Sequence, residues 1–160
     1  IYNQNPLLKG VNDDYEILSK LFSLIREYDI ENHYLFHAIP LRGMSHHRTS
    51  LKKGLDLINL LSSSGDFSGR AKPKYSVLSD IGKIIIYQDT IIKKNPLNNQ
   101  ILLKSGFKID DRLKWNTTWK KPETAEVDKN GFMNVWYLDG NDEKVNMYPA
   151  ENPNVVNFTR

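Results

Sequence analysis

The sequence predicts an α/β fold, in which strand–helix units are followed by a smaller region rich in β-strands. Two stretches with helical periodicity, at about 13–28 and after Ser50, are each preceded by a short strand-like run. After residue 65 the pattern changes to short β-like runs separated by turn signals. The 160 residues are enough for one domain or for the end of a larger one.

The composition is typical of a globular protein and excludes several classes of partner. Hydrophobic residues make up 39% of the chain and charged residues 26%, which disfavours intrinsic disorder. The net charge is only +3 and the basic residues are scattered, so we expect neither a nucleic-acid partner nor an anionic membrane. No apolar run approaches the roughly 20 residues of a membrane span, and no signal-peptide pattern is present. We therefore expect a cytoplasmic protein.

The chain contains no cysteine, so it has no disulfide, no thiolate nucleophile and no cysteine-held metal cluster of its own. It opens on Ile1 in a strand-like stretch rather than on Met. We therefore expect it to be part of a longer protein.

The first half reads as two strand–helix units. Ile1–Gln4 is predicted to end a strand, and Asn5-Pro6 to form a turn. Asp13 and Glu16 have the spacing of a capping box and predict a helix over about 13–28. The apolar residues of that helix recur at helical intervals: Tyr15, Leu18, Leu21, Phe22, Ile25 and Tyr28.

The second unit begins with a buried strand at Asn32–Ile39, which is rich in aromatic and apolar residues. A polar loop, Pro40 to Arg48, follows it. Thr49 or Ser50 then caps a second helix. The apolar positions of this helix are Leu51, Leu55, Ile58 and Leu61.

We expect three regions along the chain. Residues 1–64 form the strand–helix units, 65–140 a β-rich extension, and 141–160 a polar tail that wraps over the surface or is poorly ordered. Strands are predicted in the extension at Tyr75–Leu78, Lys83–Tyr87, Gln100–Lys104 and Phe132–Leu138.

Two groups of polar residues follow the strands of the first half. In parallel βα units, ligand-binding residues gather at the carboxyl ends of the strands. The amides of Asn3 and Gln4 qualify as ligand donors, although turn-forming amides would look the same. In the loop after the second strand, Arg48 precedes a helix N-terminus and could hold an anion there, or simply be solvated. The adjacent His46 and His47 lack the spacing that suits a metal.

Lys83 follows Gly82 and opens the apolar run 84–86. A lysine at the edge of a buried strand can lose its charge by desolvation, and a neutral amine is what a Schiff base to a carbonyl cofactor requires. The alternative is a lysine that extends its amino group to water.

Four landmarks follow one another along about residues 1–105. They are Asn3-Gln4-x-x-Leu7-Leu8-x-Gly10-Val11-Asn12-Asp13, His33-Tyr34-Leu35-Phe36, Gly43…His46-x-Arg48-Thr49…Lys53-Gly54, and Ser68-Gly69-x-Ala71-x-Pro73 followed by Gly82-Lys83. In this order they resemble the C-terminal part of the lysine 2,3-aminomutase family of radical S-adenosylmethionine enzymes.

The resemblance implies the last βα units of a partial (β/α) barrel and an isomerase that moves an amino group to the neighbouring carbon of an amino acid. S-adenosylmethionine and a [4Fe-4S] cluster, whose three-cysteine motif is absent from this chain, would generate the radical. Pyridoxal phosphate would carry the migrating nitrogen as an imine, and Lys83 would be its resting Schiff-base lysine. Asn3, Gln4 and Arg48 would bind the cofactor. Family members assemble through their C-terminal regions, which implies a homo-oligomer.

The sequence also departs from the lysine-specific enzymes. Where they place one substrate aspartate, this chain has Ile39, and the glycine run before the lysine is shortened to residues 78–82. Asp80 and His37 are then the candidate substrate-binding residues. Because an apolar residue cannot pair with an ammonium group, lysine is a doubtful substrate.

Two other functions remain open at this point. One is a radical enzyme without pyridoxal phosphate, similar to the relatives that modify a lysine of elongation factor P, in which Lys83 is structural. The other is a non-enzymatic interaction module that uses the aromatic residues of the second half. These residues are Trp115, Trp119, Trp136 and Tyr137.

Overall fold

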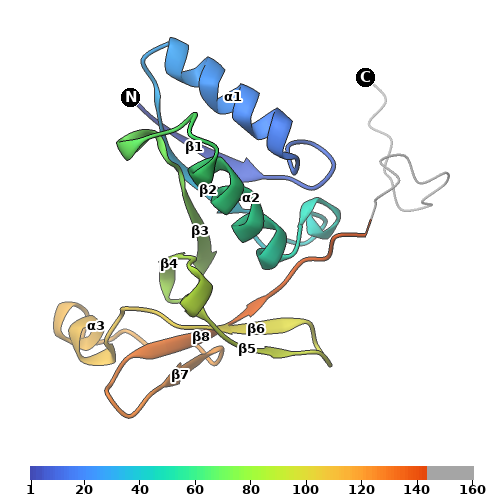
Figure 1. Ribbon diagram of the computed structural model, residues 1–160. Helices are drawn as coiled ribbons and strands as arrows, with labels where there is room; N and C mark the ends of the chain where they lie inside the picture. Colours follow the sequence, from blue (N-terminus) through green and yellow to red (C-terminus); the bar gives the residue numbers. More distant parts are fainter. Residues whose placement is uncertain (144–160) are drawn as a thin grey trace, which may run out of the picture.

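Residues 1–143, the part of the chain that the computed structural model describes, contain two four-stranded sheets and three α-helices (Figure 1). The first sheet has the strand order β1-β2-β3-β4 and the second has β5-β6-β8-β7. Within this range, no helix has the length and apolar character needed to span a bilayer. Most of the polar tail that we expected at 141–160 lies outside the described residues.

The first sheet alternates with helices along the chain, as the sequence predicts. Its elements are β1 (Tyr2–Leu7), α1 (Tyr15–Glu27), β2 (Glu31–His37), α2 (Leu51–Ser63), β3 (Lys74–Ser79) and β4 (Gly82–Ile85). β1, β2 and β3 run parallel, and β4 returns antiparallel to β3 through a tight hairpin. The predicted boundary after residue 64 therefore does not separate the sheets, because β3 and β4 complete the first one.

Local chemistry explains where these elements begin. Asn5 and Pro6 lie inside β1 rather than in the predicted turn, and Pro6 is tolerated there because β1 is an edge strand of the described sheet. Asp14, not Asp13, caps α1 by accepting from the N–H groups of residues 16 and 17. Ser50 caps α2, as predicted, by accepting from the N–H of Lys53.

The second sheet is entirely antiparallel. It consists of β5 (Ile91–Asn95), β6 (Gln100–Leu103), β7 (Ala125–Val127) and β8 (Met133–Leu138), with the short helix α3 (Ile109–Trp115) between β6 and β7. The sequence indicated β6 and β8 but not β5, β7 or α3. β7 has only three residues and α3 has no side-chain N-cap, so neither carries a strong local signal.

The two faces of the first sheet differ in what covers them. α1 and α2 pack on one face, where Leu35 and Tyr75 point into the main hydrophobic core. Asn32 also points to this side, since its amide donates to the carbonyl of Phe22 in α1. Asn32 and Leu35, three positions apart, share this side because the register between β1 and β2 shifts after Asn32. Side chains otherwise alternate along a strand, so the neighbours of Leu35 and Tyr75 lie on the opposite face, which has no helix over it in the described part. That second face carries Gln4, Pro6, Tyr34, Phe36, Leu78 and Lys83.

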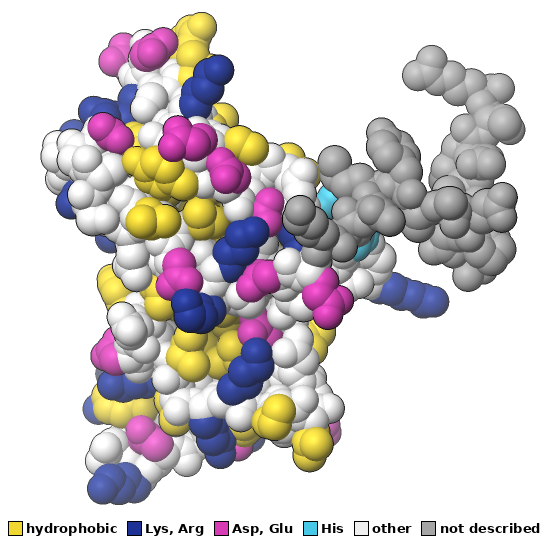
Figure 2. Space-filling model, turned by 45° about the vertical axis from the view of Figure 1, so that its right-hand side comes forward, with side chains coloured by type: hydrophobic (Ala, Val, Ile, Leu, Met, Phe, Trp, Pro, Cys, Tyr) yellow, Lys and Arg dark blue, Asp and Glu magenta, His cyan; other side chains and the backbone are white. Residues whose placement is uncertain are grey.

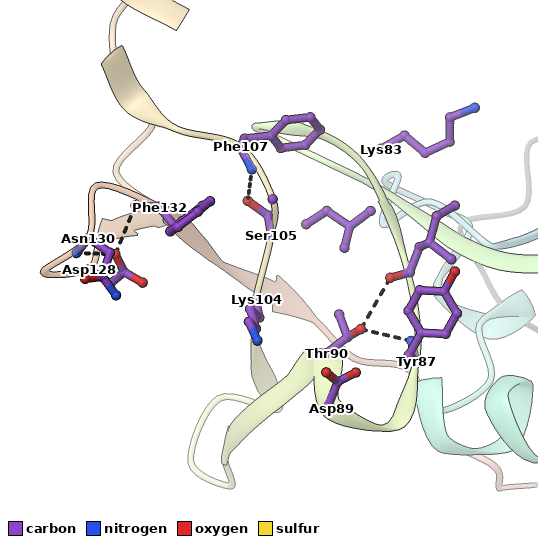
Figure 3. Close-up of a pocket in the computed structure, with 13 residues that line it drawn as sticks. Lys83, Tyr87, Asp89, Thr90, Lys104, Ser105, Phe107, Asp128, Asn130 and Phe132 are labelled. Atoms are coloured by element: carbon purple, nitrogen blue, oxygen red, sulfur yellow. Dashed lines mark hydrogen bonds between the residues drawn. The ribbon is translucent and has the colours of Figure 1, made fainter. Parts of the chain in front are cut away.

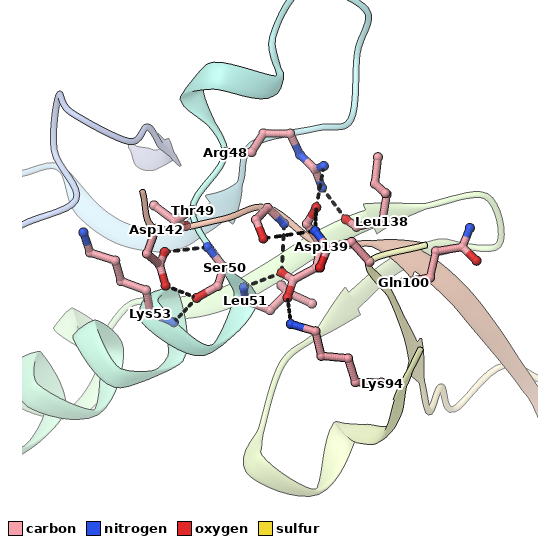
Figure 4. A network of polar contacts seen from close by, with 12 residues as sticks. Arg48, Thr49, Ser50, Leu51, Lys53, Lys94, Gln100, Leu138, Asp139 and Asp142 are labelled. Atoms are coloured by element: carbon pink, nitrogen blue, oxygen red, sulfur yellow. Dashed lines mark hydrogen bonds and ion pairs between the residues drawn. The ribbon is translucent and has the colours of Figure 1, made fainter. Parts of the chain in front are cut away.

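A buried arginine joins the two sheets. Arg48 is 2% exposed, and its Nε donates to the carbonyl of Ala38 at 2.9 Å. Its Nη atoms donate to the carbonyls of Leu138 and Asp139 at the end of β8 (Figure 4). The guanidinium is therefore committed to three backbone carbonyls. These contacts give Arg48 a structural role in the described residues, and its role in binding a cofactor anion stays a prediction.

His37 lies in the same junction and is fully buried. Its Nε2 lies 2.8 Å from the carbonyl of Thr49, which makes Nε2 the protonated nitrogen, and its Nδ1 lies 2.9 Å from the hydroxyl of Tyr137 and accepts from it. Burial, with a smaller contribution from the positive charge of Arg48, lowers the pKa of His37 from 6.5 to about 4, although the Thr49 carbonyl acts in the opposite direction. His37 is thus a neutral structural link between the sheets in the described residues, and its role in substrate binding stays a prediction.

The chain after β8 runs toward the N-terminal end of α2 and the loop before it (Figure 1). Asp139 accepts from the N–H of Leu51 at 2.8 Å, and Asp142 accepts from the N–H and hydroxyl of Ser50 (Figure 4). Lys9, only 6% exposed, donates to Asn141. These contacts place residues 139–142 against the N-terminus of α2 and the segment that follows β1.

Gly54 provides a test of the packing between α2 and the first sheet. A Cβ at this position would lie 2.1 Å from the hydroxyl oxygen of Tyr75, a side chain that is only 1% exposed. We expect Gly54→Ala to destabilise the chain by about 1–3 kcal/mol, although alanine is the better helix former by about 1 kcal/mol. Urea unfolding measures this, with Gly106→Ala as the control because nothing lies within 4 Å of a Cβ there. An unchanged midpoint for Gly54→Ala would contradict the packing.

His37 provides a test of the junction between the sheets. The His37 ring takes up a proton near pH 6.5 in the unfolded chain and only near pH 4 in the folded chain. The free energy of unfolding is therefore not reduced by His37 above pH 6.5, and it decreases as the pH falls from 6.5 to 4. The unfolding free energy should drop by about 2 kcal/mol between pH 7 and pH 5 through this residue alone. In His37→Gln the difference between the two pH values should be smaller by that amount. Equal differences in both proteins would show that His37 is not buried and neutral.

Candidate functional site

Lys83 lies on the uncovered face of the first sheet. It stands in β4 directly opposite Leu78 of β3. Its Nζ lies 4.0 Å from the ring centroid of Tyr34 and 5.5 Å from that of Phe36, both in β2. The side chain is exposed, and the described residues alone do not enclose it.

Gln4 shares this face with Lys83, but Asn3 does not. Gln4 pairs with Tyr34, so their side chains stand next to each other on adjacent strands. Asn3 pairs with Asn32 and therefore points toward α1. Its amide nitrogen is buried and has no hydrogen-bond partner among residues 1–143. Of the two predicted amides, only Gln4 is positioned to act together with Lys83.

A cleft of about 700 Å³ opens beside Lys83, between β4 and the second sheet. Its walls are β4, residues 104–107 and the turn between β7 and β8. Figure 3 shows Lys83 at the rim, with its amino group directed away from Asp128 and Asn130. The Asp128 carboxylate is engaged by the backbone N–H groups of residues 130 and 132. The cleft thus lies on the far side of Lys83 from Tyr34 and Phe36.

The second sheet holds the hairpin that carries Lys83. Arg112 of α3 donates to the carbonyl of Ile81, and the hydroxyl of Thr124 donates to the Asp80 carboxylate at 2.6 Å. Gly82 has φ +124, and a Cβ there would lie 3.1 Å from the Arg112 guanidinium. Only a glycine fits this backbone conformation and this close approach. The predicted substrate residue Asp80 therefore lies at the exposed tip of the hairpin, tied to the second sheet.

A smaller pocket of about 150 Å³ lies where β2 and β3 end. Pro40, Leu78, Trp136 and Leu138 supply its apolar walls, Asp80 supplies a carboxylate, and the rest of the lining is Ser79, Gln100, Thr124 and Tyr137. The sequence did not indicate this pocket, because Trp136 and Leu138 come from the second sheet, about 60 residues further along the chain than Leu78.

The remaining predicted polar residues do not form a metal site. The rings of His46 and His47 lie 4.0 Å apart, in a 3-10 turn before α2. Among residues 1–143, no three His, Asp or Glu side chains come together in a way that could hold a metal ion. Figure 2 shows Lys and Arg side chains interspersed with Asp and Glu over the face in view.

The chemistry of the Lys83 site suits a carbonyl cofactor. An accessible primary amine condenses with an aldehyde, and aromatic side chains beside it offer flat surfaces for a planar ring. Tyr34 and Phe36 stand in that position, and sequence reasoning missed both of them. Strand alternation could have found them, because Leu35 between them is apolar and buried. A cysteine-held cluster has no possible ligands in this chain, which contains no cysteine.

Comparisons with known proteins agree with the family resemblance of the sequence. The chain is 35% identical over 136 residues to a putative L-lysine 2,3-aminomutase of Aquifex aeolicus, a match that covers 85% of this chain and 32% of the relative. It is 39% identical over 75 residues to the L-lysine 2,3-aminomutase of Methanococcus maripaludis, covering 47% of the chain and 17% of the relative. A match to the glutamate 2,3-aminomutase of Clostridioides difficile is 30% identical over 104 residues, covering 65% and 22%.

The chain matches no protein-family model. It spans less than a third of the length of the curated relatives given above. The relatives nevertheless agree with one another, since all are named as 2,3-aminomutases. The chain belongs to a lysine 2,3-aminomutase-like family.

Proposed function

We propose that this chain is the C-terminal part of a radical S-adenosylmethionine aminomutase, which moves an amino group between neighbouring carbons of an amino acid. The observation that carries the proposal is the position of Lys83. Its amine stands on the uncovered face of a parallel sheet, beside Tyr34 and Gln4. The names of the relatives support an amino-group migration.

The proposed reaction is an isomerisation. The bond between nitrogen and the α carbon breaks, a bond between nitrogen and the β carbon forms, and one hydrogen moves from the β carbon to the α carbon. Atoms and electrons balance without a net oxidant. S-adenosylmethionine and a [4Fe-4S] cluster, bound outside these residues, would start the reaction by abstracting the hydrogen. Pyridoxal phosphate, when bound, would carry the nitrogen between the two carbons.

The residues of this chain would bind and orient the cofactor. Lys83 would hold it covalently in the resting enzyme, and Tyr34 and Phe36 would pack against its ring. Gln4 would donate a hydrogen bond from the adjacent strand. The contacts of Arg112 and Thr124 would keep the Lys83 hairpin in place while the amine exchanges partners.

The uncovered face also supports the proposed architecture. Sheets of parallel strands are normally covered on both faces, because βα connections place helices or further strands against them. Here α1 and α2 cover only one face. We propose that further strands of a partial (β/α) barrel, outside this chain, close around the other face, so that Lys83 comes to lie inside the barrel.

One observation favours a second candidate. The contact of the Lys83 amine with two aromatic rings is also what a purely structural lysine would make. In that case the complete protein would be a radical enzyme that works without pyridoxal phosphate.

Chemical trapping separates the two candidates. In the complete protein loaded with pyridoxal phosphate, borohydride reduction should attach the cofactor to Lys83, and mass spectrometry should find the label on that residue. Lys83→Ala should abolish both the label and the turnover. Lys74→Ala is the matched control, because Lys74 pairs with Tyr34 and lies on the same face of the sheet. A label on Lys74, or normal turnover by Lys83→Ala, would rule out pyridoxal catalysis at Lys83.

A further inference from the structure

The 150 Å³ pocket at the ends of β2 and β3 adjoins the Lys83 site through one residue, Leu78. The N–H of Ile86 donates to the carbonyl of Tyr75, so these two residues form a hydrogen-bonded pair between β3 and the chain after β4. Hydrogen-bonded and non-hydrogen-bonded pairs alternate along antiparallel strands. Leu78 and Lys83 are therefore a non-hydrogen-bonded pair. In such a pair the Cα atoms lie only about 4.5 Å apart and the side chains stand close together. Leu78 therefore stands beside the stem of the Lys83 side chain, whose amino group reaches across to the Tyr34 ring.

The other apolar walls of the pocket are fixed in place. Pro40 lies two positions after Ala38, and Leu138 lies at the end of β8. Arg48 donates to the backbone carbonyls of both Ala38 and Leu138. The ring nitrogen of Trp136 donates to Glu126 at 2.6 Å. The pocket is thus a built feature of the junction between the two sheets.

The pocket is poorly suited to a charged side chain. Among its described lining residues, Asp80 is the one that carries a charge. That carboxylate lies at an exposed hairpin tip and already accepts from Thr124. An ion pair at such a solvated position contributes at most about 1 kcal/mol. The same charge placed against Leu78 and Pro40 would lose hydration without gaining a partner.

We propose that the substrate is an α-amino acid with an uncharged, apolar side chain, which packs on Leu78 inside the pocket formed by Pro40, Trp136 and Leu138. A cavity of about 150 Å³ is large enough to hold a group the size of benzene. The substrate class is therefore that of leucine or phenylalanine rather than lysine or glutamate. This inference rests on the proposed function, since it takes Lys83 as the point at which the amino group is held.

A competition experiment tests the substrate class. The complete enzyme, loaded with its cluster, S-adenosylmethionine and pyridoxal phosphate, receives equal concentrations of L-leucine, L-lysine and L-glutamate, and mass spectrometry identifies the β-amino products. We expect kcat/KM for leucine to exceed that for lysine by at least about tenfold, the lower end of what apolar side-chain contacts supply. A preference for lysine or glutamate would overturn the inference while leaving the aminomutase function intact.

Leu78→Asp probes the pocket itself. It should lower kcat/KM for leucine by at least about tenfold and shift the leucine-to-lysine ratio toward lysine. Leu97→Asp, the same change at a residue that is 95% exposed in the turn between β5 and β6, should leave the ratio unchanged. An unchanged ratio in Leu78→Asp would show that the side chain lies elsewhere.

Calorimetry of amino-acid binding, without S-adenosylmethionine, tests the pocket independently of the aminomutase function. Tighter binding of leucine than lysine in a protein that isomerises neither would support the pocket and refute the aminomutase function. Tighter binding of lysine, or binding of neither, would refute the pocket.

Discussion

The buried guanidinium of Arg48 sets the geometry on which the site depends. Burying an unpaired charge costs several kcal/mol, so its three carbonyl partners must stay in place for the fold to persist. Those carbonyls belong to Ala38, at the end of one sheet, and to Leu138 and Asp139, at the end of the other. The arginine therefore fixes the relative position of the two sheets. Pro40 and Leu138 become opposite walls of one pocket because of this contact.

The two faces of the first sheet carry different kinds of side chain, because successive residues of a strand point to opposite faces. The face toward the helices is apolar and buried, and it supplies the stability of the fold. The opposite face carries aromatic, amide and amine groups that the fold does not need for its core. Lys83 lies on that second face, and the hairpin that carries it is held by hydrogen bonds from Arg112 and Thr124. The residues that stabilise the fold and the residues of the proposed active site thus lie on opposite faces of the same four strands.

Much of the architecture could be predicted from the sequence, because it depends on local patterns. The caps and periodicities of α1 and α2 are short-range signals, and Lys83 stood out because it opens an apolar strand. The alternation of side chains along β1 would also have placed Asn3 on the same face as the buried Leu7 and Gln4 on the opposite face. The roles of His37 and Arg48 could not be predicted, because their partners Tyr137 and Asp139 lie about 90–100 residues away along the chain. A loop arginine looks the same whether it holds a ligand or a distant carbonyl.

A structure of the complete protein with pyridoxal phosphate and a bound aliphatic amino acid would test the arrangement most directly. The carbon atoms of the substrate side chain should lie within about 4.5 Å of Leu78, Pro40 and Trp136, with the cofactor stacked near Tyr34 on the same side of the sheet. A substrate side chain directed away from Leu78 would contradict the pocket, and a cofactor bound on the helix-covered side would contradict the role given to Lys83.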